Sequence, residues 1–189
     1  LHVFATAAAR DAKNGPEFIA QVEKITRGPV SLLAGAEEAR LSALGVISGF
    51  RDPNGVAGDL GGGSLDMVDV KGREIGAGET FPLGGLMLEE ASAKSPEKAA
   101  TIARDALARS AVLKKGKGRR FYAIGGTWRS LARLHMSQTG YPLHVMHNYA
   151  IEAEEALEFC ELVGHHDLSS IESIDSVSRR WRPRRSERS

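Results

Sequence analysis

The chain has 189 residues, and its 25 lysines and arginines nearly balance its 24 aspartates and glutamates. Hydrophobic residues make up 42% of the sequence, which is typical of a globular protein and excludes wholesale disorder. The single cysteine, Cys160, excludes a disulfide framework and a multi-thiolate metal site, and it favours a reducing compartment. No apolar run approaches the roughly 20 residues that a membrane-spanning helix needs, so we expect a cytoplasmic protein without a membrane partner.

The net charge of +1 conceals an asymmetry between the C-terminal end and the rest of the chain. Residues 179–189 hold six arginines and one glutamate, which leaves the remainder at −4. This basic segment has no apolar periodicity, so we expect a disordered tail. It could bind nucleic acid non-specifically, but no aromatic platform or reading helix accompanies it, and we expect no specific nucleic-acid partner.

The first 50 residues alternate between strand and helix patterns. We expect a strand over 1–5, a helix over 7–12 capped by Thr6, a helix from 18 to 28, a strand over 29–33 and a helix over 35–48. Glu37 and Glu38 fall in the first turn of the last helix, where the helix dipole favours negative charge. The turn-rich segment 52–55 that follows is a plausible domain junction.

The pattern then changes to a period of two. It predicts strands over 56–60, 64–70 and 74–81, helices over 86–93 and 96–113, a basic loop over 114–120 and a strand over 121–124. The remaining elements that we expect are a tight turn over 125–127, a helix over 128–136, a short strand over 145–149, a helix over 152–163 and a helical turn over 167–174. This alternation predicts an α/β fold.

The most informative motif is the segment GDLGGGSLD at residues 58–66. Glycines lack a Cβ atom, so the backbone N–H groups of such a run can converge on an anion, most often a phosphate. Two carboxylates, Asp59 and Asp66, flank the run and could hold Mg²⁺ directly or through water. The alternative is a hairpin turn with a flexible glycine run, since short motifs are weak by themselves.

The paired carboxylates Glu37 and Glu38 form a second candidate. Adjacent residues cannot share one helical face, so one carboxylate can point into a cleft while the other is solvated. The one in the cleft could act as a general base toward water. The alternative is that both residues only complement the helix dipole.

Three further features could contact an anion. Gly125-Gly126-Thr127 joins a strand to a helix and could approach a nucleoside or phosphate, or it could simply allow a close strand–helix crossing. Arg10 could pair with a phosphate in a bidentate way, or with Asp11 or a nearby glutamate. The basic loop at 114–120 could attract a polyanion, or it could be a solvated hairpin tip.

The order and spacing of these motifs resemble the exopolyphosphatase / guanosine pentaphosphate phosphohydrolase (Ppx/GppA) family over roughly residues 1–178. The segments that carry the resemblance are 5–12 with Asn14-Gly15, 35–41 with Gly45-Val46, 59–64, and 125–127. The resemblance implies the actin-like, ribonuclease-H-like fold of the sugar kinase/Hsp70/actin superfamily, in which two domains face a cleft. Residues 1–52 would end the first domain, residues 53–178 would form the second, and 179–189 would be the tail.

The resemblance also implies an activity, the Mg²⁺-dependent hydrolysis of terminal phosphoanhydride bonds in inorganic polyphosphate or pppGpp. Glu38 would be the general base, and Asp59 and Asp66 would hold the metal; Asp66 stands where the family usually has Glu. The phosphate-binding residues would be Arg10, Gly61, Gly62, Gly63, Ser64, Gly126 and Thr127.

Two departures from the family pattern limit these expectations. The family begins with a strand–turn–strand carrying Asp-x-Gly-Ser-Asn-Ser, which does not occur here, and its pattern ends after Ser178. We therefore expect a fragment truncated at both ends, with at most weak activity. The alternatives are a non-catalytic module that binds a nucleotide, polyphosphate or a partner, including a homodimer, and a sugar- or acetate-kinase relative. The kinase alternative is disfavoured by the segment 37–40.

Overall fold

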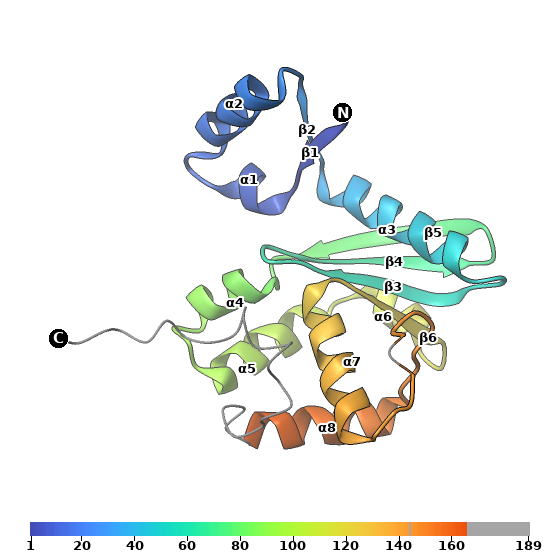
Figure 1. The fold of residues 1–189 in the computed structure, drawn as a ribbon. Coiled ribbons are helices and arrows are strands. Elements are labelled where there is room, and N and C mark those ends of the chain that lie inside the picture. Colours follow the sequence, from blue (N-terminus) through green and yellow to red (C-terminus); the bar gives the residue numbers. More distant parts are fainter. Residues whose placement is uncertain (144, 166–189) are drawn as a thin grey trace. The chain divides into compact units, whose positions relative to one another are not determined.

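The computed structural model describes residues 1–143 and 145–165 (Figure 1). The chain forms two compact units, Leu1–Thr127 and Trp128–Ser189, which are described separately below. The helical turn expected at 167–174 and the disordered tail expected at 179–189 lie outside the described residues. The domain boundary expected near residue 52 stays a prediction.

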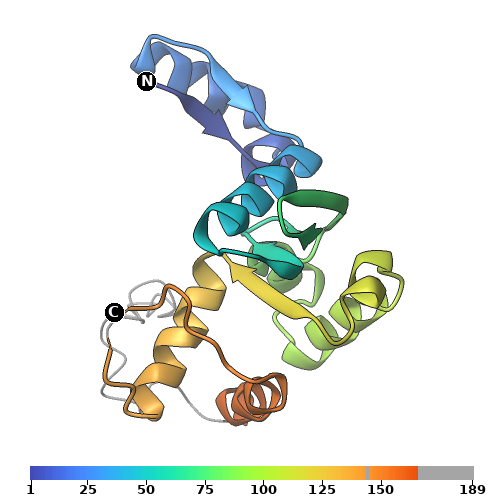
Figure 2. The same ribbon diagram turned by 90° about the vertical axis from the view of Figure 1, so that its right-hand side faces the viewer.

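The first unit begins with a small layer of two strands and two helices, coloured blue in Figures 1 and 2. Strand β1 (Val3–Ala5) pairs in parallel with β2 (Val30–Leu32), and α1 (Ala7–Asp11) and α2 (Gly15–Thr26) connect them. The side-chain cap expected from Thr6 is wrong, because Thr6 makes no capping hydrogen bond. The start of α1 packs closely on Gly63. A Cβ atom added at Gly63 would lie 3.7 Å from the Ala8 amide nitrogen.

A four-stranded sheet forms the centre of the first unit. Helix α3 (Gly35–Gly49) leads into the meander of β3 (Asn54–Leu60), β4 (Leu65–Lys71) and β5 (Glu74–Phe81), and β6 (Arg120–Ile124) follows later in the chain. The strand order is β5-β4-β3-β6, with antiparallel pairing in the meander and parallel pairing between β3 and β6. The predicted meander and the strand at 121–124 are therefore confirmed.

Both faces of this sheet are covered by helices because its strands alternate two sets of apolar side chains. On one face α3 packs Ala39, Ala43 and Val46 against Ala57, Val68, Val70 and Tyr122. On the other face Val56, Leu65 and Met67 pack with Val112 and with partly buried residues of the helices after β5. Figure 1 shows α3 on one side of the sheet and α5 and α6 on the other.

Three short helices connect β5 to β6: α4 (Gly85–Ala91), α5 (Pro96–Leu107) and α6 (Ala111–Gly116). The single helix predicted over 96–113 is wrong, because Ser110 interrupts it. Its hydroxyl accepts a hydrogen bond from the Leu113 amide at 3.0 Å and donates one to Glu79 on β5. Glu79 also accepts from the Ala111 amide at 2.9 Å. These hydrogen bonds, with that from Ser110 foremost, hold the pKa of the Glu79 carboxyl below its usual value.

The second unit contains α7 (Gly126–Gln138), which starts at the end of the first unit, and α8 (Ala153–His165). Buried His135 lies 2.6 Å from the Tyr149 hydroxyl and 3.2 Å from a Glu155 oxygen. The strand predicted over 145–149 is wrong: this segment forms a turn in which Asn148 has φ +62°. None of the described helices is long and apolar enough to cross a membrane.

We expect Ser110→Ala to lower the free energy of unfolding by about 1 kcal/mol, because the α6 amides lose their cap and Glu79 loses a donor. Urea denaturation followed by circular dichroism measures this effect. Ser48→Ala is the matched control, because the Ser48 hydroxyl is exposed and donates only to the Gly45 carbonyl within its own helix. Equal losses in both variants would contradict the bracing role of Ser110.

Candidate active site

A pair of aspartates lies across two neighbouring strands at one end of the sheet. Asp59 on β3 is directly opposite Asp66 on β4, and Asp66 is opposite Thr80 on β5. Directly opposed residues have Cβ atoms about 4.5–5.5 Å apart, and like charges at such positions destabilise a sheet. Charged groups kept close together against this cost are typical of functional sites.

Hydroxyl groups compensate the two carboxylates. Asp66 is buried, with 3% of its surface exposed, and it accepts hydrogen bonds from the Ser64 and Thr80 hydroxyls, both at 2.6 Å. Asp59 is only partly buried and accepts a hydrogen bond from Ser42 on α3 at 2.7 Å. Asp66 is therefore held firmly within the sheet, while Asp59 remains more accessible to a ligand.

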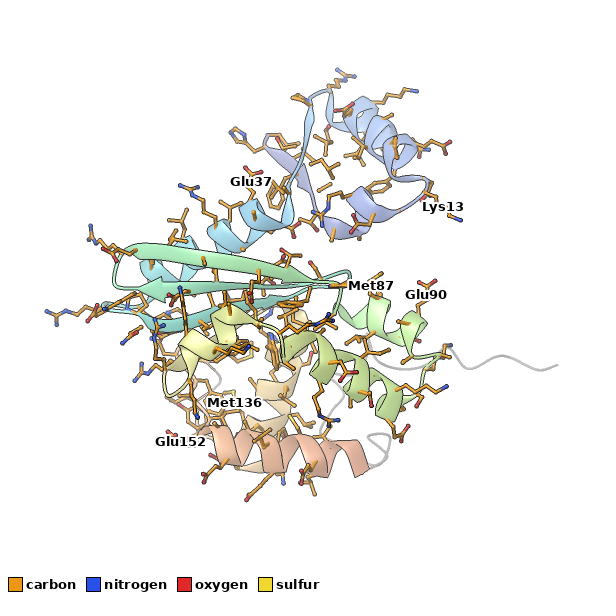
Figure 3. All side chains as sticks on the ribbon, turned by 180° about the vertical axis from the view of Figure 1, so that it is seen from behind. Lys13, Glu37, Met87, Glu90, Met136 and Glu152 are labelled. Carbon is orange, nitrogen blue, oxygen red and sulfur yellow. The ribbon has the colours of Figure 1, made fainter. Side chains whose placement is uncertain are left out.

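The first turn of α3 faces the same end of the sheet. Gly35 lies so close that an added Cβ would sit 2.6 Å from Thr80 Oγ1 and 3.2 Å from an Asp66 oxygen. Glu37, labelled in Figure 3, is exposed, whereas the Glu38 side chain is only 16% exposed. The two adjacent carboxylates thus have the different environments that the sequence predicted.

Arg10 reaches this site from α1. Its Nη1 atom donates to Glu38 Oε1 at 2.9 Å and to the Leu33 carbonyl at 2.7 Å, and its Nε lies 3.2 Å from an Asp11 oxygen. The ion-pair alternative considered for Arg10 is therefore present. The contact engages one Glu38 oxygen, so the second oxygen can accept a hydrogen bond from water.

The site has an excess of negative charge. Burial raises the pKa of the Glu38 carboxyl above its usual value, and the nearby charges of Asp66 and Asp59 raise it further, while Arg10 opposes the shift. Three carboxylates from α3, β3 and β4 thus lie near one another, and the Arg10 guanidinium pairs with only one of them, Glu38. An anionic substrate could approach this cluster only with a cation or with protonation of a carboxylate.

The glycine run forms the hairpin between β3 and β4. The Gly61 amide donates to the Ser64 carbonyl at 2.9 Å, and the carbonyls of Gly61 and Gly62 accept from the Gly85 and Leu86 amides at 3.1 and 3.0 Å. The carbonyls are thereby directed to the start of α4. Binding of phosphate by the amides of Gly61, Gly62, Gly63 and Ser64 stays a prediction.

The second glycine turn meets the same edge of the sheet. Gly125 follows β6 with φ +117°, and a Cβ atom there would lie 2.4 Å from the Leu60 carbonyl oxygen and 3.3 Å from an Asp59 oxygen. Glycine is required by both the dihedral angle and the close approach. Gly126 and the exposed Thr127 follow at once, so the turn borders the aspartate pair. Their contact with phosphate stays a prediction.

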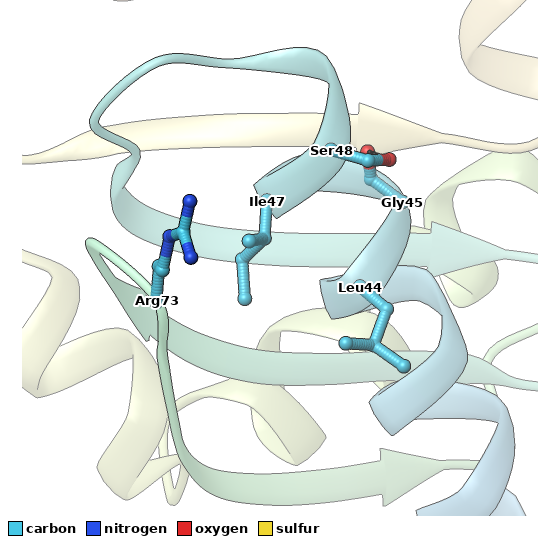
Figure 4. A pocket seen from close by; sticks show the side chains of 5 residues that line it. All are labelled: Leu44, Gly45, Ile47, Ser48 and Arg73. Carbon is cyan, nitrogen blue, oxygen red and sulfur yellow. Dashed lines mark hydrogen bonds between the residues drawn. The ribbon is translucent and has the colours of Figure 1, made fainter.

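Two residues of the cluster were missed by sequence reasoning, Ser42 and Thr80. Ser42 stands four residues after Glu38, the spacing that places both side chains on one face of a helix. Thr80 could have been found from the antiparallel register of β4 and β5. A separate pocket lies near the other end of α3 and is lined by Leu44, Gly45, Ile47, Ser48 and Arg73 (Figure 4). It contains no carboxylate.

The carboxylates can be compared with the requirements of a Mg²⁺ site. Among the described residues, no group of three or more His, Cys, Asp or Glu side chains is arranged to hold a metal ion. Mg²⁺ is often bound by one or two carboxylates together with water and substrate phosphates. Partly exposed Asp59 fits this requirement, whereas both Asp66 oxygens already accept hydroxyl hydrogen bonds and fit a contact through water.

Comparisons with known proteins agree with this architecture. Residues 1–183 match the model of the Ppx/GppA phosphatase family. The chain is 34% identical to exopolyphosphatase 1 of Mycobacterium leprae over 145 residues, covering 71% of this chain and 43% of that protein. It is 28% identical to exopolyphosphatase 2 of Mycobacterium tuberculosis over 182 residues, covering 87% and 56%. The chain thus spans about half the length of these relatives.

Solved structures show the same fold. An exopolyphosphatase from Cytophaga hutchinsonii matches with a TM-score of 0.62 and 24% identity, covering 75% of this chain and 49% of that one. The Ppx/GppA enzyme of Aquifex aeolicus matches with a TM-score of 0.56 and 26% identity, covering 74% and 48%. The predicted α/β fold class is confirmed, because the chain has the same fold as these phosphatases. The chain belongs to the Ppx/GppA phosphatase family.

Substitutions at two adjacent glycines, Gly84 and Gly85, test how tightly the β3–β4 hairpin packs on the start of α4. An added Cβ at Gly84 would lie 2.4 Å from the Gly62 and Gly63 backbone, whereas at Gly85 it would meet nothing within 4 Å. We expect Gly84→Ala to lower the free energy of unfolding by about 1–3 kcal/mol through overpacking. Gly85→Ala, the control, should be neutral or slightly stabilising. Chemical denaturation measures both; equal values would show that the hairpin does not pack on Gly84 as described.

Proposed function

We propose that this chain hydrolyses the terminal phosphoanhydride bond of inorganic polyphosphate, using the carboxylate cluster of Glu38, Asp59 and Asp66. The observation that carries the proposal is the position of a half-buried glutamate facing two aspartates at the end of the sheet, beside two glycine turns and an arginine. Phosphoryl transfer depends mainly on positioning and neutralisation of charge, and such a cluster can provide both. The relatives named exopolyphosphatase support this substrate class.

Glu38 acts as the general base in the proposed reaction. A water molecule donates a proton to the free Glu38 oxygen while its own oxygen attacks the terminal phosphorus. The bond from that phosphorus to the bridging oxygen breaks, and the chain shortened by one phosphate departs with the bridging oxygen and its electron pair. The proton then passes from Glu38 to solvent, so the products are inorganic phosphate, the shortened chain and one proton.

The negative charge of the carboxylate cluster would be offset by a divalent cation. Asp59 would hold Mg²⁺, with Asp66 contacting it through water, and the ion would supply charge neutralisation to the phosphates. Arg10 has two roles in this arrangement, because it orients Glu38 in the free protein and presents a guanidinium to an incoming phosphate. The amides of Gly62, Gly63 and Ser64, with Gly126 and Thr127, would bind phosphate oxygens, whereas the Gly61 amide already donates to the Ser64 carbonyl.

The nucleotide pppGpp presents the same terminal bond as polyphosphate. We favour polyphosphate because the two relatives compared above carry that activity in their names. Competition between the two substrates for the active site of this protein distinguishes them. Polyphosphate should suppress pppGpp turnover at a lower concentration of phosphate groups than pppGpp needs to suppress polyphosphate turnover. Preferential turnover of pppGpp would overturn this choice while leaving the hydrolytic site in place.

We expect weak Mg²⁺-dependent release of phosphate from polyphosphate by this chain, and we expect Glu38→Gln to lower the rate about 100-fold or more, the usual range for loss of a general base. A colorimetric phosphate assay measures both rates. Glu37→Gln is the matched control, because Glu37 is exposed on the neighbouring position. Release that is unaffected by Glu38→Gln, or absent from both proteins, would overturn the proposal.

Arg10 should set the acid side of the pH–rate profile. The raised pKa of Glu38 means that the base becomes protonated, and activity is lost, at a higher pH than for an ordinary glutamate. Arg10 holds this pKa down, so Arg10→Gln should raise it further and move the acid limb of kcat/KM to higher pH.

The position of the acid limb, rather than the height of the profile, is the measurement, because Arg10→Gln also removes a phosphate contact. Lys13→Gln removes a positive charge from an exposed position close in sequence and should leave the limb in place. A limb that stays fixed or moves to lower pH in Arg10→Gln would show that Arg10 does not act on the ionisation of Glu38.

A further inference from the structure

The end of the sheet opposite the carboxylates is strongly basic. Strands β3 and β6 begin there, the β4–β5 turn lies there, and α6 ends there. We call this surface the basic end; its exposed cationic residues include Lys71, Arg73, Lys115, Lys117 and Arg120. Two exposed carboxylates, Asp52 and Glu74, lie among them. Among the described residues, no salt bridge engages any of these five cations.

Contacts across strands and loops hold these segments together. Lys71 is opposite Asn54, and Arg120 is opposite Gly55 on the same strand. Arg119 lies at the centre, where it donates to the Asn54 side chain at 2.7 Å and to the Val70 carbonyl at 2.9 Å. Its guanidinium also pairs with Asp69 at 2.7 Å, so its charge is compensated within the protein. The neighbouring cations are thus carried by a rigid frame and face solvent.

The surface at this end is also hollowed. Arg73 lies at the β4–β5 turn and forms one wall of the pocket in Figure 4, opposite Ile47 and Ser48 of α3. The cations of this turn and of the loop after α6 therefore flank the sheet from both of its faces. Such a concentration of unpaired positive charge attracts polyanions and raises their rate of association.

We propose that the basic end binds the distal part of a long inorganic polyphosphate chain whose terminal phosphate occupies the carboxylate site; this inference rests on the proposed function. The seven residues of β3 separate the two ends by roughly 23 Å. A long phosphate chain spans that distance and a triphosphate does not. The carboxylate end repels a polyanion, so the basic end retains the substrate while its terminus reaches the catalytic end.

The test compares substrates of two lengths on two charge-matched variants. Lys71→Gln/Lys115→Gln/Lys117→Gln removes three cations of the basic end, and Lys13→Gln/Lys24→Gln/Lys98→Gln removes three exposed lysines elsewhere. Binding of long-chain polyphosphate and of tripolyphosphate is measured by calorimetry in 50 mM salt with Mg²⁺, after circular dichroism confirms the fold of each variant.

We expect the basic-end variant to bind long-chain polyphosphate about tenfold more weakly, with a shallower dependence on salt, because fewer counterions are exchanged. Its affinity for tripolyphosphate should not change, and the control variant should behave as the parent. Equal weakening in both variants, or no weakening in either, would overturn the inference. Tighter binding of duplex DNA than of polyphosphate at the basic end would also overturn it.

The assay separates this inference from the proposed function. Binding needs no turnover, so long-chain binding at the basic end combined with no phosphate release would refute only the activity of this chain. Conversely, phosphate release could depend on Glu38 but proceed at equal rates from long and short chains, in the parent and in the basic-end variant. That result would leave the catalytic proposal intact and refute the role of the basic end.

Discussion

The opposed carboxylates of Asp59 and Asp66 constrain the rest of the first unit. Two like charges at paired positions of an antiparallel ladder repel each other, and the neighbouring structure supplies the compensation. Hydroxyls reach the pair from α3, from the hairpin and from β5, and Arg10 brings the only guanidinium bonded to Glu38 among the described residues. A cation bound by this end would relieve the repulsion between the two carboxylates.

Much of this arrangement could be predicted from the sequence. The period of two placed three strands correctly, and the glycine run and the paired glutamates fall at one end of the sheet, where the candidate site lies. What could not be predicted depends on tertiary contacts. Helix α5 ends at Leu107, although Ala108 and Arg109 are good helix formers. Ser110 then caps α6 by accepting from the Leu113 amide, and its contact with Glu79 on a distant strand could not be predicted from the sequence.

The candidate site shows the same division between local and distant information. The sequence suggested both a phosphate contact and an ion pair for Arg10, and only the structure shows that its partner is Glu38, 28 positions away. Ser42 could not be recognised from the sequence, because its role depends on a hydrogen bond to Asp59 on a different element. The strand expected at 145–149 failed because Asn148 adopts a left-handed dihedral, which ends an extended segment and which Asn tolerates well.

The contact between Gly58 and Phe121 has an evolutionary consequence. The Phe121 ring lies across the bare backbone of β3, and a Cβ atom at position 58 would be 2.2 Å from its edge. Because Phe121 is 43% exposed, a side chain at position 58 requires this ring to turn away from β3 or to be replaced by a smaller group. Related sequences that carry alanine or a larger residue at position 58 should therefore show either a smaller side chain at 121 or an aromatic ring turned toward solvent.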